Sequence, residues 1–281
     1  MSFIMIEKIQ NIYTKICLAI LKNIDPFKKL IGRSNSREYI FYIKHIINIT
    51  VNGLSWKKLG TILNLDIDFI RKKYNKWIQL GVFSKANNII LKQYKKKHES
   101  SSLFIDSTNI VNFSGCLNVG YNIKIKNKKS LKISALVDHN KVPYILDISK
   151  GSVHDAKIME NIINNNFNNN KKKINLVGDK GYIKNEIYIK QIKDKHNITL
   201  ITPLRVNSKK KIVINTDNEY ENSETQINLL NDRFNVEHFF CLLKKGYKRI
   251  STINDKTLKH YNNFLNIAAS LISLNITINL A

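Results

Sequence analysis

The sequence predicts an α/β protein in which a mixed β-sheet is flanked by helices and preceded by a small all-α domain. Apolar residues recur at helical spacing through the first third of the chain. From Leu103 the period changes, and short β-type runs appear at 103–105, 131–137 and 142–148. Helical and strand patterns then alternate, and the chain closes on helical ones, an order typical of a sheet covered by helices.

The N-terminal segment is expected to hold three helices in succession. Residues 3–22 carry isoleucines at helical spacing and predict an amphipathic helix, which either contacts a second copy or packs on the chain's own core. Ser36 is the expected N-cap of a second helix. Gly53 followed by Ser55 predicts a turn and the N-cap of a short third helix. We place a first boundary after residue 36.

A fourth helix, expected to be capped by Asp66 and to end at Gly81, has one apolar face and one basic face. The face turned away from the apolar stripe carries Arg71, Lys72, Asn75, Lys76 and Gln79. A short helix that braces a second one with a free basic face is typical of a helix-turn-helix, whose second helix enters the major groove of DNA. An ordinary three-helix bundle with a solvated face is the alternative. With a basic linker expected at Lys92 to Lys97, residues 37–98 form the predicted DNA-binding domain and residues 99–281 the catalytic one.

The elements of the second half follow from the same patterns. Residues 138–140 predict a hairpin turn, and Ser152 is the expected cap of a helix over 153–163. The remaining expected elements are a low-complexity loop at 164–173, strands at 174–177 and 198–201, helices near 185–195, 225–245 and 256–278, and a polar loop up to 224. The run from Phe264 to Leu280 is the nearest to a membrane span, but polar residues interrupt it, so a core helix is predicted.

The composition indicates an anionic partner. The chain has 46 Lys and Arg against 21 Asp and Glu, a formal net charge of +25, which favours nucleic acid. An AT-rich genome, which enriches lysine codons, is the alternative source of this charge. A membrane-surface role is disfavoured because the basic residues are spread along the whole length. Three distant cysteines offer neither a disulfide framework nor zinc spacing, and no secretory signal is evident, so a reducing cytoplasmic or nuclear compartment is expected.

Three acids stand where chemistry could use them. Asp106 follows the apolar run 103–105, and Asp179 follows the run 174–177. Glu237 lies in the apolar pattern of the penultimate helix. Hard oxygen ligands from separate elements suit Mg²⁺ or Mn²⁺, and two such ions could serve an in-line phosphoryl displacement. A cap or a surface charge is the alternative for any one of these acids taken alone.

At these residues the chain resembles the DDE transposases of bacterial insertion sequences, especially the compact-core branch of the insertion sequence 4 and 5 superfamily. Residues 104–108 (Phe-Ile-Asp-Ser-Thr) resemble the strand of the first Asp, and residues 178–182 (Gly-Asp-Lys-Gly-Tyr) resemble the second-Asp motif. Arg233, Glu237 and Lys244 match the spacing of the third-acid signature. The resemblance covers about residues 37 to 275 and implies an RNase H-like catalytic domain.

The resemblance also implies roles for neighbouring residues. Arg233 and Lys244 would be DNA-contacting or site-ordering cations on the helix of Glu237, although Arg233 also stands at the spacing of a plain helical salt bridge. Asp155 would orient the metal site without itself binding the metal. Alternatively, it is an acid at the start of a helix, where the helix dipole favours a negative charge. Two positions depart from the family signature: Leu230 replaces a common Tyr, and His238 replaces a common Arg.

The activity implied is cleavage of double-stranded DNA at terminal inverted repeats and strand transfer into target DNA. The implied cofactor is a pair of Mg²⁺ or Mn²⁺ ions, and the implied assembly is a homodimer with no membrane partner. A related endonuclease that does not join DNA, and a non-catalytic DNA-binding derivative, are the alternatives.

Overall fold

The computed structural model describes residues 3–24, 36–112, 119–122, 125–126, 128–168, 170–203, 212–214 and 223–280. The chain forms two compact units. The first comprises Met1–Lys97, Asn112–Leu117 and Leu242–Ala281, and the second comprises His98–Val111 and Asn118–Cys241. The C-terminal segment therefore groups with the N-terminal helices, which differs from the linear division expected at residues 36 and 98.

The first unit is helical in its described part. Its elements are α1 (Phe3–Ile24), α2 (Ser36–Asn52), α3 (Trp56–Leu63), α4 (Asp68–Gln79), α5 (Val82–Lys97), α10 (Lys248–Ser251) and α11 (Leu258–Leu280). The last helix packs against α5, α1, α2 and α4, which explains why the C-terminal segment belongs to this unit. At its centre, the rings of Tyr74 and Phe264 stack with centroids 4.8 Å apart.

The C-terminal helix α11 is long and apolar enough to cross a membrane. However, 61% of its most apolar window is buried inside the protein. Its Tyr261 hydroxyl donates to the carbonyl of Ile250, and its Ser270 hydroxyl donates to Asn87 on α5. These contacts fit the predicted core helix.

Several local predictions in the first unit are confirmed and two need correction. The Ser55 hydroxyl caps α3 by accepting from the Lys58 amide, and Gly81 follows α4 with a positive φ. The Asp66 carboxylate accepts from the Asp68 amide, but the N-cap position itself is Ile67. Lys92 to Lys97 are not a linker but the end of α5, because Phe83, Ala86, Ile90 and Tyr94 give that segment a buried helical stripe.

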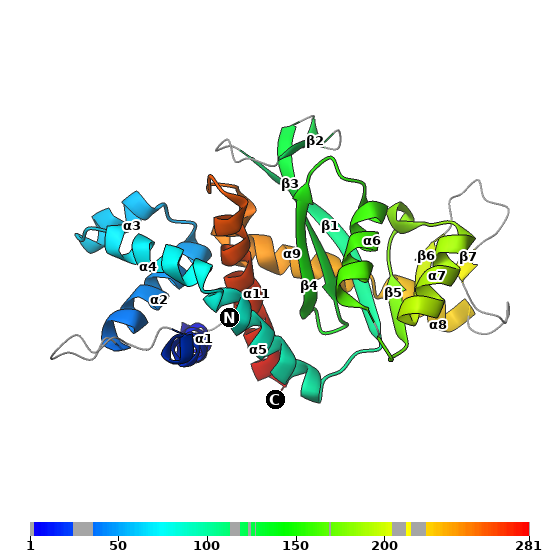
Figure 1. The fold of residues 1–281 in the computed structure, drawn as a ribbon, viewed down its shortest axis with the longest axis horizontal. Coiled ribbons are helices and arrows are strands. Elements are labelled where there is room, and N and C mark those ends of the chain that lie inside the picture. Colours follow the sequence, from blue (N-terminus) through cyan, green and yellow to red (C-terminus); the bar gives the residue numbers. More distant parts are fainter. Residues whose placement is uncertain are drawn as a thin grey trace. The chain divides into compact units, whose positions relative to one another are not determined.

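The second unit is a seven-stranded mixed sheet flanked by helices, an RNase H-like fold (Figure 1). Its strands are β1 (Ser102–Val111), β2 (Gly120–Asn122), β3 (Lys128–Val137), β4 (Pro143–Lys150), β5 (Ile174–Val177), β6 (Ile198–Pro203) and β7 (Ile212–Ile214). The order is β2-β3-β1-β5-β6-β7, with β4 also on β3. Strand β3 pairs antiparallel with β1, β2 and β4, and β7 pairs antiparallel with β6. The pairs β1–β5 and β5–β6 are parallel.

Helices cover both faces of this sheet. They are α6 (Asp155–Asn166), α7 (Glu186–His196), α8 (Ser223–Asn231) and α9 (Phe234–Gly246), with a short 3₁₀ turn η2 at Lys180–Tyr182. Leu103 and Ile105 of β1 join the apolar cluster with α6 and α7. Because side chains alternate along a strand, Asp106 points to the opposite face, where Figure 1 draws α9 behind the sheet.

The second half also differs in detail from the expectation. The first strand extends to Val111, so Asp106 lies within β1 and not at its end. The helix at 155–166 is capped by the His154 ring, which accepts from the Ala156 amide, and not by Ser152. The single helix expected over 225–245 is two helices, α8 and α9, with a turn at residues 232–233. The expected strand at 174–177 matches β5.

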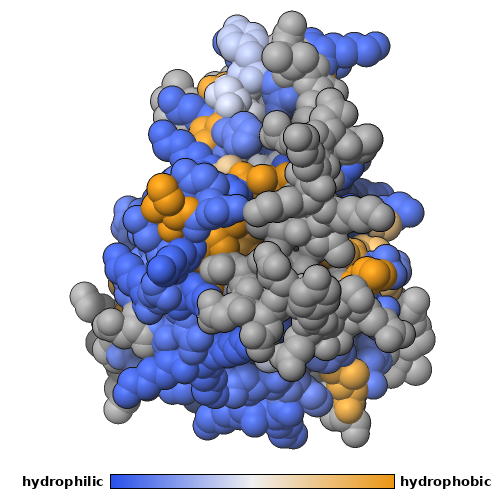
Figure 2. Space-filling view, turned by 90° about the vertical axis from the view of Figure 1, so that its right-hand side faces the viewer, coloured by the Kyte–Doolittle hydropathy of each residue, from blue (hydrophilic) through white to orange (hydrophobic). Residues whose placement is uncertain are grey.

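The described surface agrees with the composition. Among the residues drawn in colour in Figure 2, hydrophilic ones dominate, with smaller groups of apolar ones between them. Cys17 is a buried free thiol and Cys241 a half-buried one, whereas Cys116 lies outside the described residues.

Candidate active site

Asp106 and Asp179 come from adjacent parallel strands. In the register of β1 and β5, Phe104 is paired with Val177, and each acid stands two residues beyond its member of that pair. Both carboxylates are therefore placed beside each other where β5 ends, as expected for ligands at the carboxyl ends of parallel strands. Asp106 is half-buried, with 23% of its side chain exposed.

Arg233 links Asp106 to Glu237. It lies in the turn just before α9, and its Nη2 is 3.0 Å from Oε1 of Glu237. Its Nη1 is 3.8 Å from Oδ2 of Asp106. The structure thus brings Glu237 and Arg233 to Asp106, and the helical salt bridge considered for Arg233 exists together with a contact to the first acid.

The electrostatics of Asp106 reflect this crowding. Burial, with the negative charges of Asp179 and Glu237, raises the pKa of Asp106 from 3.8 to about 6. The Ser107 amide, which donates to Oδ1 at 2.8 Å, and the Arg233 guanidinium act in the opposite direction. A carboxyl group whose pKa is raised by like charges and desolvation is typical of a site prepared for a cation.

A tight turn fixes the carboxylate of Asp179. The Gly181 amide donates to Oδ1 of Asp179 at 2.7 Å, and the Tyr182 amide donates to its carbonyl. A Cβ at Gly181 would lie 2.9 Å from that Oδ1, so any larger residue here would displace the carboxylate. The buried Tyr182 hydroxyl is 3.0 Å from Ser107 Oγ, which is 2.7 Å from Ser134 Oγ. These hydroxyl contacts therefore connect the turn that carries Asp179 to β1, the strand that carries Asp106.

A further buried ion pair lies beside this turn. Nζ of Lys132, on β3, is 2.8 Å from Oδ1 of Asp155, the first residue of α6. The Lys132 side chain is only 7% exposed. Sequence reasoning singled out Asp155 but missed Lys132, for which the signal was a lysine within the apolar run 131–137.

The donor set suits a divalent cation. Within the described ranges, no three Asp, Glu, His or Cys side chains lie close enough together to hold a metal ion. Mg²⁺, however, is commonly held by one or two carboxylates together with waters and substrate phosphates. Asp106 and Asp179 fit that requirement, and Arg233 occupies the position between Asp106 and Glu237.

The other signature residues are placed differently. Lys244 is on α9, seven residues beyond Glu237, but it falls in the first compact unit; burial lowers its pKa. Leu230 is half-buried on α8, and His238 is exposed on α9. Neither of these two contributes to the group formed by Asp106, Arg233 and Glu237.

The predicted DNA-reading helix belongs to the first unit. Arg71, Lys72 and Lys76 are exposed on α4, and Arg71 forms an ion pair with Asp68. Oδ1 of Asn75 accepts a hydrogen bond from His260 Nε2 at 2.9 Å, so that polar residue is engaged within the protein. The exposed basic face of α4 is therefore made by Arg71, Lys72 and Lys76.

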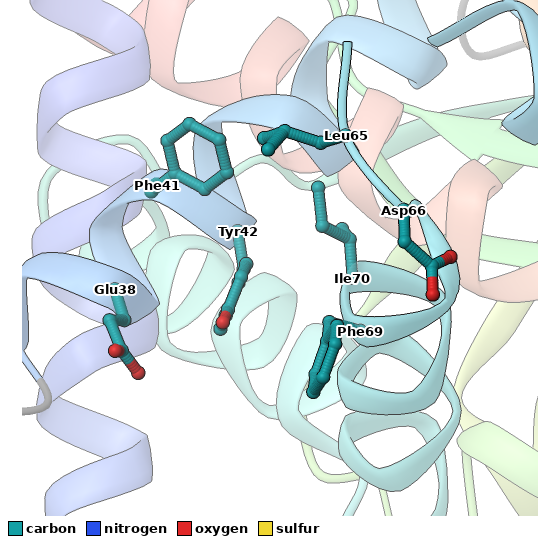
Figure 3. A pocket seen from close by; sticks show the side chains of 7 residues that line it. All are labelled: Glu38, Phe41, Tyr42, Leu65, Asp66, Phe69 and Ile70. Carbon is teal, nitrogen blue, oxygen red and sulfur yellow. The ribbon is translucent and has the colours of Figure 1, made fainter. Parts of the chain in front are cut away.

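A groove of about 570 Å³ lies between α2 and the first turn of α4 (Figure 3). It is lined by Glu38, Phe41, Tyr42, Leu65, Asp66, Phe69 and Ile70. The carboxylates of Glu38 and Asp66 make this groove unsuitable for a phosphate backbone.

Comparison with known proteins agrees with the fold. The family model described as "Transposase DDE domain" matches residues 97–276. Among solved structures, the cryo-EM structure of the piggyBac transposase synaptic complex with hairpin DNA is similar, with a TM-score of 0.52 and 12% identity. That match covers 96% of this chain and 66% of that chain, and it shows the shared fold. No curated protein matches the sequence.

The mixed sheet and its flanking helices define an RNase H-like protein. The chain belongs to the transposase DDE domain family.

Proposed function

We propose that the chain is a DNA transposase that cleaves DNA at the ends of a mobile element and transfers the strand to a target. Asp106, Asp179 and Glu237 are its acids. The observation that carries this proposal is the meeting of Asp106 with Glu237 through one guanidinium, with Asp179 beside Asp106 in register. Acidic side chains with no common function would not be expected to come together at one place from three separate elements.

In this proposal each residue has its own task. Asp106 and Asp179 would hold Mg²⁺ or Mn²⁺, which when bound in pairs stabilises charge on the attacking and leaving oxygens of a phosphoryl displacement. Glu237 completes the carboxylate set once Arg233 turns away. Arg233 then has a free guanidinium, whose fork geometry fits a phosphate of the DNA backbone.

Double-stranded DNA is the proposed partner. The exposed cations Arg71, Lys72 and Lys76 suit the major groove and its phosphates, and Lys244 suits the strand bound along α9. A homodimer would present two such sets to the two ends of the element. Binding would weaken steeply with salt, since each phosphate contact releases counterions.

The catalytic test uses single alanine variants at Asp106, Asp179 and Glu237 on DNA that carries the inverted repeats flanking the coding region. Each variant should lose Mg²⁺-dependent cleavage and keep DNA binding, whereas the exposed Asp194→Ala on α7 should keep both. Retained nicking by any of the three removes that residue from the site. With pre-cleaved ends, absence of joined product would favour an endonuclease without strand transfer.

The binding test uses Lys72→Gln/Lys76→Gln, with Lys171→Gln/Lys173→Gln, in an exposed loop, as the charge-matched control. Loss of two phosphate contacts should reduce the slope of log K against log salt by about 2. An equal slope for both double variants would exclude α4 from the DNA interface.

A further inference from the structure

Lys132 is a buried cation that the proposed reaction does not use. Its Nζ donates to the Val153 carbonyl at 2.6 Å and to Oδ1 of Asp155 at 2.8 Å. A buried ammonium is costly unless such partners compensate for the lost hydration. The two acceptors explain how the lysine is tolerated in β3, but an apolar residue would fill the same position at lower cost.

Asp155 connects Lys132 to the turn that carries Asp179. One oxygen of Asp155 binds Lys132, and the other, Oδ2, lies 3.7 Å from the position that a Cβ of Gly181 would take. The Gly181 amide in turn donates to Oδ1 of Asp179 at 2.7 Å. The ion pair, the turn and the second acid therefore lie next to one another.

The ion pair of Lys132 and Asp155 compensates for a negative charge close to Asp179. Asp155 adds a negative charge close to the turn of Asp179, and like charges at short range repel. Lys132 neutralises Asp155, which allows α6 to start against the turn. Arg233 has the corresponding position between Asp106 and Glu237 on the other face of the sheet.

We propose that Lys132 is a positioning residue: through Asp155 it holds the Asp179–Tyr182 turn and so fixes the direction of the Asp179 carboxylate. It contacts neither DNA nor metal. The inference rests on the proposed function in so far as Asp179 is taken as a metal ligand. Two measurements test it, and one of them does not depend on metal binding.

The first readout is independent of metal. Hydrogen exchange of the Gly181 amide is measured in metal-free full-length Lys132→Met, which keeps the side-chain length and removes the charge. Exchange should be faster than in the wild type, because the turn loses its support. Lys150→Met, which removes an exposed lysine from neighbouring β4, should leave it unchanged. Thermal unfolding checks that both variants are folded at the temperature used.

The second readout is the binding of Mn²⁺ alone, followed by electron paramagnetic resonance. Lys132→Met should bind Mn²⁺ about tenfold more weakly, the usual effect of losing a group that orients a metal ligand. A lysine that acted only through its charge would give the opposite result, because its removal makes the site more negative. The double variant Lys132→Met/Asp155→Asn should be no weaker than the single one, since Lys132 acts through Asp155.

Unchanged exchange at Gly181 in Lys132→Met overturns the inference, as does Mn²⁺ binding equal to or tighter than that of the wild type. If wild-type protein binds no Mn²⁺, the proposed function fails, and the Gly181 exchange still decides whether Lys132 holds the turn.

Discussion

Arg233 lies 3.8 Å from Asp106, and the same guanidinium is 3.0 Å from Glu237. The turn at residues 232–233, which separates α8 from α9, places the arginine there. In this arrangement a protein cation occupies the position between the first and third acids. A divalent ion that uses both acids must therefore displace it, and the displaced guanidinium becomes available for a phosphate.

Arg233→Met should change metal binding and DNA cleavage in opposite directions. Mn²⁺ binding to the free protein should tighten, because the competing cation is gone. Cleavage of DNA should fall by about 100-fold if the arginine contacts phosphate in the reaction. Electron paramagnetic resonance measures the first effect and a nicking assay the second. The control is Lys245→Met, which removes an exposed lysine of α9. Weaker Mn²⁺ binding in Arg233→Met would contradict the competition.

Asp106→Asn should stabilise the metal-free protein at neutral pH. Because folding raises the pKa of Asp106 from 3.8 to about 6, the native state favours the protonated form. The stability that this preference contributes is complete below pH 3.8 and is lost as the pH rises to about 6. The variant should therefore gain about 1–3 kcal/mol in free energy of unfolding near pH 7.5, and almost nothing near pH 4.

Urea denaturation in the presence of a chelator, at both pH values, measures this difference. Asp194→Asn, an exposed acid, should show no gain at either pH. A wild-type protein more stable than Asp106→Asn at neutral pH would show that Asp106 is not under the stated repulsion.

The candidate acids could be predicted from the sequence because their motifs are local. A short apolar run followed by an acid marks a strand near its end, and β5 has the expected bounds. The extension of β1 beyond Asp106 was missed because the polar residues Ser107 and Asn109 interrupt the apolar pattern of the strand. In the structure both of these residues pair with β3.

Other features depend on tertiary contacts that no local pattern contains. The lysines of α5 resemble a linker until Tyr94 is seen to be buried. The break between α8 and α9 lies in a continuous helical pattern. Lys132 stands out in the sequence as a lysine within an apolar run, but its partners Val153 and Asp155 lie 21 and 23 residues further along the chain.

Arg249→Met should unfold the protein more easily, since it leaves a buried charge unpaired. Arg249 and Asp255 are 4% and 7% exposed and lie 2.7 Å apart, and Arg249 also donates to the Leu54 carbonyl. The expected loss is about 3–5 kcal/mol in free energy of unfolding, measured by urea denaturation. Arg249→Met/Asp255→Leu should recover part of it, and a double variant as unstable as the sum of both single ones would contradict the pairing.

Gly181→Ala should impair catalysis with little loss of stability. The new methyl group would meet Oδ1 of Asp179 at 2.9 Å, so this carboxylate must shift. A misplacement of this kind costs on the order of 100-fold in rate.

Gly246→Ala, at the end of α9, is the matched control: nothing lies within 4 Å of the added Cβ. That variant should cleave DNA like the wild type and be more stable by about 0.5–1 kcal/mol, the gain of alanine over glycine in a helix. Wild-type cleavage by Gly181→Ala would show that the reaction does not depend on the direction in which this turn holds Asp179.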